Sequence, residues 1–160
     1  MLTDETFCKM DLKCVYCDGI ISEIPRGFYV YVIVTDGNYY VGQTENLYKR
    51  INSHKITNTN NITSDNARVY ILEKLNYTDD MRIMEVIWIT WFCLNTDSCI
   101  NKEKGSYKIR CGIINTRTIC IIESKYNVFC EYEYIKGIKL LDKQNHVTVL
   151  SEIEYFGKAL

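Results

Sequence analysis

The clearest pattern along the chain is a run of strand-forming side chains that a tight turn interrupts. Residues 28–34 read Phe-Tyr-Val-Tyr-Val-Ile-Val, and aromatic and β-branched side chains of this kind favour extended strands. Asp36-Gly37 follows, a pair typical of two-residue hairpin turns, and residues 38–41 resume the strand pattern. The sequence therefore predicts a β-hairpin that ends at Gly42.

After the hairpin, apolar side chains recur every three or four residues, which is the period of a helix. This spacing predicts helices over residues 46–55, 64–76 and 78–94. Ser64 and Thr78 are suitable N-caps for the second and third of them. The third is apolar nearly all round, so we expect it to be buried.

The predicted elements divide the chain into three parts. Residues 1–26 are expected to be an irregular, cysteine-containing extension, residues 27–118 the core, and residues 119–160 a C-terminal extension packed on the core. Strand-like runs at 118–122 and 126–134, and a short strand or helix at 147–155, make that extension β-rich. The expected fold class is α+β, with a small antiparallel sheet, built from the hairpin and a further strand, flanked by helices.

The charge of the chain says less than its distribution. The 160 residues carry a formal net charge of −1, which does not indicate a nucleic-acid binder. Between Gln43 and Leu75, however, five Lys/Arg residues stand against three acidic ones, and between Asp97 and Lys125 six stand against three. Such surfaces can hold phosphates while the overall charge stays near zero, although ordinary solvated charges would give the same counts.

Membrane and export signals are missing from the sequence. No apolar run approaches the roughly 18 residues of a membrane span, and the first residues lack the basic-then-apolar pattern of a signal peptide. We therefore expect an intracellular protein, cytoplasmic or nuclear, without a membrane partner. The abundance of Ile, Asn, Lys and Tyr is typical of AT-rich coding sequences, as in many viruses and mobile elements.

The eight cysteines are accordingly expected to be thiols or metal ligands. Cys14-Val-Tyr-Cys17 has the spacing of half a zinc site, and Cys8 is near it in sequence. The further donors that could complete such a site are Cys93, Cys99, Cys111, Cys120, Cys130 and His146. The alternative is that cysteines in apolar contexts are small core side chains.

Residues 29–54 bring together the side chains that hydrolysis of a phosphodiester needs. Tyr29 and Tyr31 share one face of a strand, and Tyr40 stands on the returning strand. Arg50 and His54 are four residues apart, so they are neighbours on a helix surface. A base for the attacking water and a cation for the charged phosphate are both present in this set.

This pattern resembles the GIY-YIG nuclease superfamily. Tyr40-Val41-Gly42 matches the second signature of the family. The downstream pattern of the family, with its spacing, is met at Asn46, Leu47, Arg50 and His54. The first signature can be placed in two ways: Gly27-Phe28-Tyr29 fits its letters, whereas Tyr31 fits the Tyr-Val-Tyr strand of many members.

The resemblance implies one Mg²⁺ or Mn²⁺ ion held by a helical glutamate. Glu85 fits this role, because it is the only charged residue between Ile83 and Leu94. A carboxylate in such surroundings is costly to bury unless a cation meets it. Glu73, which lies in a more polar stretch, is the alternative.

The resemblance also implies roles for the other side chains. Tyr31 or Tyr40 would take the proton of the attacking water, with Tyr29 as the other candidate. Arg50 would stabilise the scissile phosphate, and His54 would orient a tyrosine or shuttle a proton.

DNA is the substrate that the resemblance implies. The expected contacts to DNA, in addition to the catalytic residues, are Lys49, Lys55, Arg68 and Asn115. A symmetric cut of both strands by a single-site enzyme would require a homodimer. Two alternatives remain open: a GIY-YIG fold that binds nucleic acid without cleaving it, and a zinc-stabilised interaction module.

Overall fold

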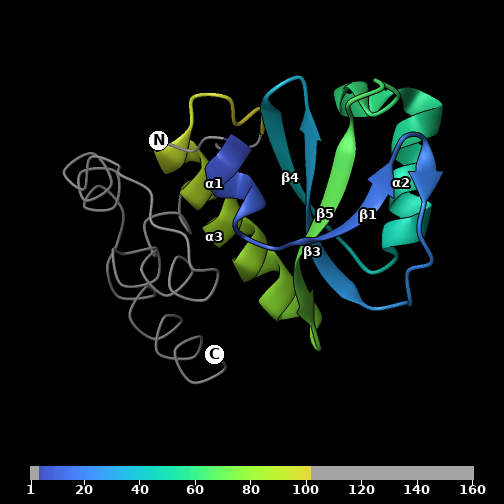
Figure 1. Cartoon of the computed structure of the whole chain (residues 1–160). Coiled ribbons are helices and arrows are strands. Elements are labelled where there is room, and N and C mark those ends of the chain that lie inside the picture. The colour runs from blue at the N-terminus through green and yellow to red at the C-terminus, as the bar shows by residue number, and fades with distance from the viewer. Residues whose placement is uncertain (1–3, 102–160) are drawn as a thin grey trace. The chain divides into compact units, whose positions relative to one another are not determined.

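The computed structural model describes residues 4–101, which fall into two compact units. One contains residues 4–11 and 86–97, and the other, here called the sheet unit, contains residues 12–85 and 98–101. In chain order the elements are α1 (Asp4–Cys8), β1 (Lys13–Cys17), β2 (Ile20–Ile21), β3 (Phe28–Thr35), β4 (Asn38–Thr44), α2 (Leu47–Thr57), the 3₁₀ helix η1 (Thr59–Asn61), β5 (Arg68–Leu75) and α3 (Thr78–Asn95) (Figure 1).

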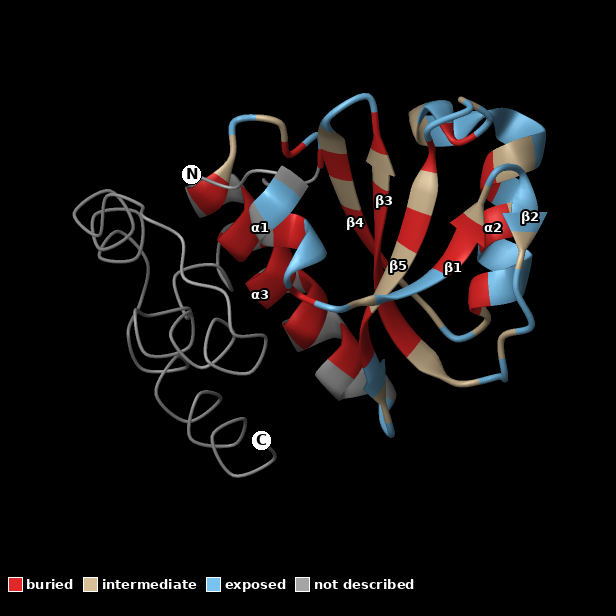
Figure 2. Ribbon diagram, viewed as in Figure 1, coloured by how far each residue is buried: buried red, intermediate tan, exposed pale blue. Residues whose placement is uncertain are grey.

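The sheet unit is built on five antiparallel strands in the order β2-β1-β5-β3-β4. Strand β3 is paired along both edges and is almost wholly buried (Figure 2). Its aromatic and β-branched side chains suit this central position, because they pack well on a pleated surface that is covered. The sheet and the helices confirm the predicted α+β class, whereas the predicted β-rich C-terminal segment lies outside the described residues.

The hairpin of β3 and β4 has the turn that the sequence predicts, and its register determines which side chains can meet. Residues 36–37 both have positive φ, 49° and 74°, as a type I′ turn requires. Directly opposed residues of an antiparallel pair point to the same face. Tyr31 is opposite Gly42, and Ile33 is opposite Tyr40. The side chains of Tyr31 and Tyr40 therefore project from one face of the sheet.

Helix α2 begins and ends with local hydrogen bonds that its sequence provides. The side chain of Asn46 accepts a hydrogen bond from the backbone N–H of Lys49 at 2.9 Å, which caps the first turn. Asn58 adopts the left-handed conformation and donates its N–H to carbonyls of the last turn. The buried residues of the helix are Leu47, Ile51 and His54.

The hydrophobic core of the sheet unit combines α2 with the face of the sheet that carries Tyr31. Leu47 and Ile51 join buried side chains of β1, β3 and β5 in one cluster. Each fully buried aliphatic side chain of this kind contributes roughly 1.5 to 3 kcal/mol to stability. This packing holds the helix against the strands and so positions the side chains discussed below.

The predicted helix over residues 64–76 is wrong, because residues 68–75 form β5. The three-residue spacing of Val69, Leu72 and Leu75 fits a helical face, but hydrogen bonding to strands on both edges stabilises the extended form. A register shift opposite Val30 and Tyr31 breaks the two-residue alternation that marks a strand.

The other predicted elements have mixed outcomes. The helix predicted over 78–94 is confirmed as α3, and the helix predicted over 46–55 is confirmed as α2. The prediction that residues 1–26 are irregular is wrong, since α1, β1 and β2 lie there and β1 pairs with β5. The strands predicted at 118–122 and 126–134, and the element at 147–155, lie outside the described residues.

The unit that contains residues 4–11 and 86–97 has a group of aromatic side chains on α3. Trp88, Trp91 and Phe92 are buried, with ring centroids 5.1 to 6.1 Å apart. Phe7 of α1 lies 6.4 Å from Phe92. Among the described helices, none has the length and apolar character needed to cross a membrane.

Candidate active site

Four side chains that the sequence selects meet on the α2 side of the sheet: Tyr31, Tyr40, Arg50 and His54, here called the tyrosine cluster. The hydroxyl of Tyr31 lies 3.0 Å from Nε2 of His54, and Nε of Arg50 donates to the same hydroxyl at 3.3 Å. The guanidinium of Arg50 also hydrogen-bonds the hydroxyl of Tyr40. The ring of Tyr40 contacts the ring of His54 edge-on, with centroids 6.0 Å apart.

Gly42 makes the position of the Tyr31 hydroxyl possible. A Cβ atom at residue 42 would lie 2.5 Å from the hydroxyl oxygen of Tyr31 and 2.6 Å from its Cζ. Tyr31 thus crosses over β4 at the one residue of that strand without a side chain. The glycine of the Tyr40-Val41-Gly42 motif serves this close approach, because its backbone φ is not in the left-handed region.

Burial determines the protonation states in the tyrosine cluster. Desolvation raises the pKa of Tyr31 well above that of an ordinary phenol, and the hydrogen bond from Arg50 only partly opposes this. Desolvation, together with the charge of Arg50, lowers the pKa of His54 to about 4. At neutral pH the hydroxyl of Tyr31 therefore accepts a hydrogen bond from Arg50 and shares another with Nε2 of a neutral imidazole.

The hydrogen bonds of Arg50 leave its positive charge in place. Its bonds to the hydroxyls of Tyr31 and Tyr40 raise the pKa of the guanidinium further, and neutral hydroxyls do not cancel a charge. Arg50 is also exposed. An exposed guanidinium fixed by two tyrosines is suited to bind a phosphate.

Glu85 lies near the cluster but is reached from the other face of β4. Side chains alternate along a strand, so Gln43 projects from the face opposite to that of Tyr40. Its Nε2 donates to Oε2 of Glu85 at 2.8 Å. The charge of Glu85 contributes to the raised pKa of Tyr31, which places the two groups within electrostatic reach.

Glu85 and Gln43 are the residues of this region whose oxygen atoms could contribute to holding a hard divalent cation. Glu85 is 7% exposed, and Oε1 of Gln43 is buried without a hydrogen-bond partner. Carboxylate and amide oxygens are the ligands that Mg²⁺ and Mn²⁺ prefer. Among residues 4–101, however, no group of three or more His, Cys, Asp or Glu side chains could hold a metal. Such a cation would therefore keep several waters, as Mg²⁺ commonly does.

Two of the predicted site residues are not part of this arrangement. The hydroxyl of Tyr29 donates to the carbonyl of Pro25 at 2.8 Å, so it is not joined to the tyrosine cluster. Of the two candidate tyrosines on β3, Tyr31 is the one that belongs to the cluster. Glu73 is buried on β5 rather than on a helix. Asn115 lies outside the described residues.

Asn101 has a role that the sequence analysis missed. Its Nδ2 donates to the carbonyl of Val41 at 2.7 Å, and its Oδ1 accepts from the N–H of Val41 at 2.9 Å. These two bonds hold the outer edge of β4 beside the tyrosine cluster. The only sequence signal is an asparagine after the third helix, which does not reveal a partner sixty residues away.

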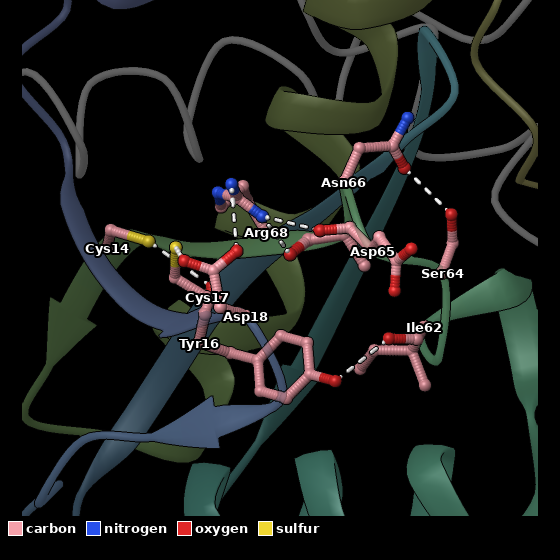
Figure 3. A network of polar contacts seen from close by, with 10 residues as sticks. Cys14, Tyr16, Cys17, Asp18, Ile62, Ser64, Asp65, Asn66 and Arg68 are labelled. Carbon is pink, nitrogen blue, oxygen red and sulfur yellow. Dashed lines mark hydrogen bonds and ion pairs between the residues drawn. The ribbon is translucent and has the colours of Figure 1, made fainter.

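The predicted DNA contacts differ in their surroundings. Lys49 is exposed on α2, next to Arg50. Nζ of Lys55 donates to the carbonyl of Gly19 at 3.0 Å. Arg68 forms an ion pair with Asp18, with Nη2 and Oδ1 3.3 Å apart (Figure 3). Of these three residues, Lys49 is thus the exposed one that adjoins Arg50 in the sequence.

The thiols of the Cys-x-x-Cys segment lie beside that ion pair. Sγ of Cys14 donates to the carbonyl of Tyr16 at 3.3 Å, and Sγ of Cys17 donates to Oδ2 of Asp18 at 3.2 Å (Figure 3). Both cysteines are free. Four of the donors proposed to complete a zinc site, Cys111, Cys120, Cys130 and His146, lie outside the described residues.

Comparison with known proteins agrees with this geometry. Residues 27–96 match the family model of the GIY-YIG catalytic domain. The chain is therefore similar to GIY-YIG catalytic domains over these residues. The resemblance inferred from the sequence is thereby confirmed over the segment that contains the tyrosine cluster and Glu85, and it indicates a function of the nuclease type. No curated protein and no solved structure gave a significant match.

Proposed function

We propose that this GIY-YIG protein is a divalent-cation-dependent endonuclease that hydrolyses phosphodiester bonds of DNA. The observation that carries the proposal is the hydrogen-bonded set of Arg50, Tyr31 and His54, in which an exposed guanidinium adjoins a hydroxyl bonded to a neutral base. Phosphoryl transfer depends mainly on positioning and on electrostatic stabilisation, and this set supplies both.

In the proposed mechanism Arg50 binds a non-bridging oxygen of the scissile phosphate, and Tyr40 orients the guanidinium. As Arg50 turns towards the phosphate, the oxygen of Tyr31 becomes able to accept a hydrogen bond from water. The water loses its proton to Tyr31 while the proton of Tyr31 moves to Nε2 of His54. The new P–O bond forms as the ester P–O bond breaks, and solvent protonates the leaving oxygen.

The raised pKa of Tyr31 is the reason for proposing a concerted relay. Because burial raises the pKa of Tyr31, a free tyrosinate is not a species available at neutral pH. A concerted transfer through Tyr31 avoids that species and leaves the positive charge on His54. A cation held at Glu85 would stabilise the negative charge that develops on the phosphate and on the leaving oxygen.

The proposal is tested by incubating the full chain with supercoiled plasmid in Mg²⁺ or Mn²⁺ and measuring nicking under single-turnover conditions. Nicking should require the cation and should fall by about 10²-fold or more in Arg50→Ala and Glu85→Gln. Tyr29→Phe is the matched control for Tyr31→Phe, because the hydroxyl of Tyr29 is bonded to a backbone carbonyl.

Two results would contradict the proposal. The first is the absence of nicking on plasmid, branched DNA and single-stranded DNA alike. The second is nicking that survives unchanged in Arg50→Ala, which would point to a contaminating enzyme. DNA binding without cleavage would instead support the inactive GIY-YIG module.

A further inference from the structure

Gln43 is a residue of the sheet unit for which neither the family resemblance nor the tyrosine cluster provides a role. It lies on β4 directly after Gly42, and its amide has two ends in different situations. Nε2 donates to Oε2 of Glu85 at 2.8 Å, whereas Oε1 is buried and accepts no hydrogen bond. A buried acceptor without a partner is costly, so its presence beside an expected cation ligand needs an explanation.

The orientation of the Gln43 amide is fixed by Glu85. If the amide were flipped, Oε1 would face the carboxylate oxygen, and two acceptors would then be in contact. With Nε2 towards Glu85, Oε1 must point elsewhere. The described residues contain three further buried side-chain atoms without a partner, on Asn60, Trp91 and Asn95. Only the one on Gln43 belongs to a side chain bonded to Glu85.

The chemistry of the unsatisfied atom indicates what would meet it. Oε1 is an acceptor, so phosphate oxygens and carboxylates cannot satisfy it, because they have no proton to donate. The waters of a hydrated divalent cation are strong donors. Glu85 is the carboxylate bonded to Gln43, and no cluster of three or more His, Cys, Asp or Glu that could hold a metal occurs in the described residues. Several waters would therefore remain on the cation.

We infer that Gln43 is a positioning residue for the divalent cation of the proposed nuclease, holding the Glu85 carboxylate through Nε2 and a water of the cation through Oε1. This inference rests on the proposed function, because it takes Glu85 as the cation ligand. Partners of metal ligands commonly act in this way: they orient the ligand and contribute to affinity without contacting the metal.

A purely structural role for Gln43 gives a different expectation. It would require only the bond to Glu85, and removal of the amide would then change thermal stability without changing cation affinity. The two readings are separated by measuring binding of Mn²⁺ alone, without DNA and without reference to cleavage. Free Mn²⁺ is quantified by electron paramagnetic resonance, in titrations of the full chain.

The decisive variants are Gln43→Leu and Gln43→Glu. Gln43→Leu removes both interactions at similar volume and should weaken Mn²⁺ binding about tenfold. Gln43→Glu places a second carboxylate beside Glu85. It should therefore lower the melting temperature without metal and show a larger rise on addition of Mn²⁺ than the unaltered protein does. A purely structural contact would give the lower melting temperature without the larger rise on addition of Mn²⁺.

Two carboxylate variants serve as references. Glu85→Gln should abolish binding, and Glu73→Gln, which removes another buried carboxylate of the sheet unit, should leave the dissociation constant within about twofold, since only a ligand or its partner sets affinity. If Glu85→Gln loses Mn²⁺ while Gln43→Leu binds within twofold of the unaltered protein, the inference about Gln43 is wrong and the cation site stands.

Other outcomes would contradict the cation site itself as well as the role of Gln43. If the unaltered protein binds no Mn²⁺, or if Glu85→Gln binds as well as the unaltered protein, both the inference and the cation part of the proposed function fail. If Gln43→Leu does not fold, as judged by circular dichroism, the inference is tested with Gln43→Glu alone. A rise in melting temperature with Mn²⁺ no larger than that of the unaltered protein then contradicts the inference.

Discussion

Two polar networks of the sheet unit each contain a tyrosine and an arginine, but the hydrogen-bond and ion-pair partners of these residues differ. In the tyrosine cluster, Arg50 donates to the hydroxyl of Tyr31, which carries no charge. Tyr16, Asp18 and Arg68, at the β1–β5 side of the sheet, are here called the edge network. In it Arg68 forms an ion pair with the carboxylate of Asp18, 3.3 Å away. Among the described side chains Arg50 therefore has no carboxylate partner at ion-pair distance, whereas Arg68 has one.

The tyrosines of the two networks also differ in the hydrogen-bond partners of their hydroxyls. The hydroxyl of Tyr16 donates to the backbone carbonyl of Ile62 at 3.0 Å, a partner that cannot accept a proton at neutral pH. The hydroxyl of Tyr31 is hydrogen-bonded instead to Nε2 of His54, an imidazole nitrogen that can take up a proton. Burial raises the pKa of both tyrosines, so a shifted pKa alone does not distinguish a functional tyrosine. The chemistry of the partner does.

The largest expected difference between the networks is that between the two arginines. Arg50→Ala should reduce single-turnover nicking by about 10²- to 10³-fold, as loss of a group that stabilises transition-state charge typically does. Arg68→Ala should reduce it by less than about threefold and should lower stability by about 1 kcal/mol or less, because its ion pair is partly exposed. Equal losses of activity in the two variants would mean that Arg68 binds DNA despite its carboxylate partner.

The next difference concerns the tyrosine hydroxyls. Tyr31→Phe removes the relay and should lower the nicking rate by about 10²-fold or more. Tyr16→Phe leaves the carbonyl of Ile62 without its partner and should cost about 1 to 3 kcal/mol of stability, with nicking unchanged in the folded protein. Urea unfolding and plasmid nicking measure the two effects. A Tyr31→Phe variant with full activity would eliminate the relay and leave Tyr40 as the candidate.

A smaller difference is expected between the effects of alanine at Gly42 and at Gly19. Gly42→Ala would place a Cβ 2.5 Å from the hydroxyl of Tyr31, and overpacking of this kind costs about 1 to 3 kcal/mol and should displace Tyr31. At Gly19, in the turn between β1 and β2, a Cβ meets nothing within 4 Å, but φ is +78°. Gly19→Ala should therefore cost about 1 to 2 kcal/mol through backbone strain alone. Only Gly42→Ala should also reduce nicking, measured where both variants are folded.

The tyrosine cluster was predictable because its members are tied to local signals. Asp36-Gly37 specifies the turn and hence the register of the hairpin. Asn46 caps α2, and that start places Arg50 and His54 on adjacent turns. Each of these features depends on residues a few positions apart, so sequence spacing is enough to find them.

The edge network and the Gln43 contact were not predictable, because they depend on pairings between distant segments. Strand β5 is extended because β1 and β3 flank it, and no local pattern reveals those partners. Gln43 reaches Glu85 across 42 positions of sequence. The choice between Tyr29 and Tyr31 was undecided for a similar reason: both lie on one strand face, and only the directions of their hydroxyls separate them.

The last expected effect is a pH dependence of stability that arises from His54 of the tyrosine cluster, a residue type that the edge network does not contain. Desolvation and Arg50 lower the pKa of folded His54 to about 4, from an ordinary value of 6.5. Between these two values the unfolded chain binds more protons than the folded one, so the free energy of unfolding rises with pH from about 4 to 6.5 and is level above that window.

His54→Gln should flatten this rise, because glutamine does not titrate. The measurement is urea unfolding at several pH values from 4 to 8 for both proteins, taking the difference in unfolding free energy at each pH so that contributions common to both cancel. A difference that does not change across the window would show that His54 has a similar pKa in the folded and unfolded chains. The lowered pKa of His54 would then be removed from the proposed relay, while the binding of phosphate by Arg50 would be unaffected.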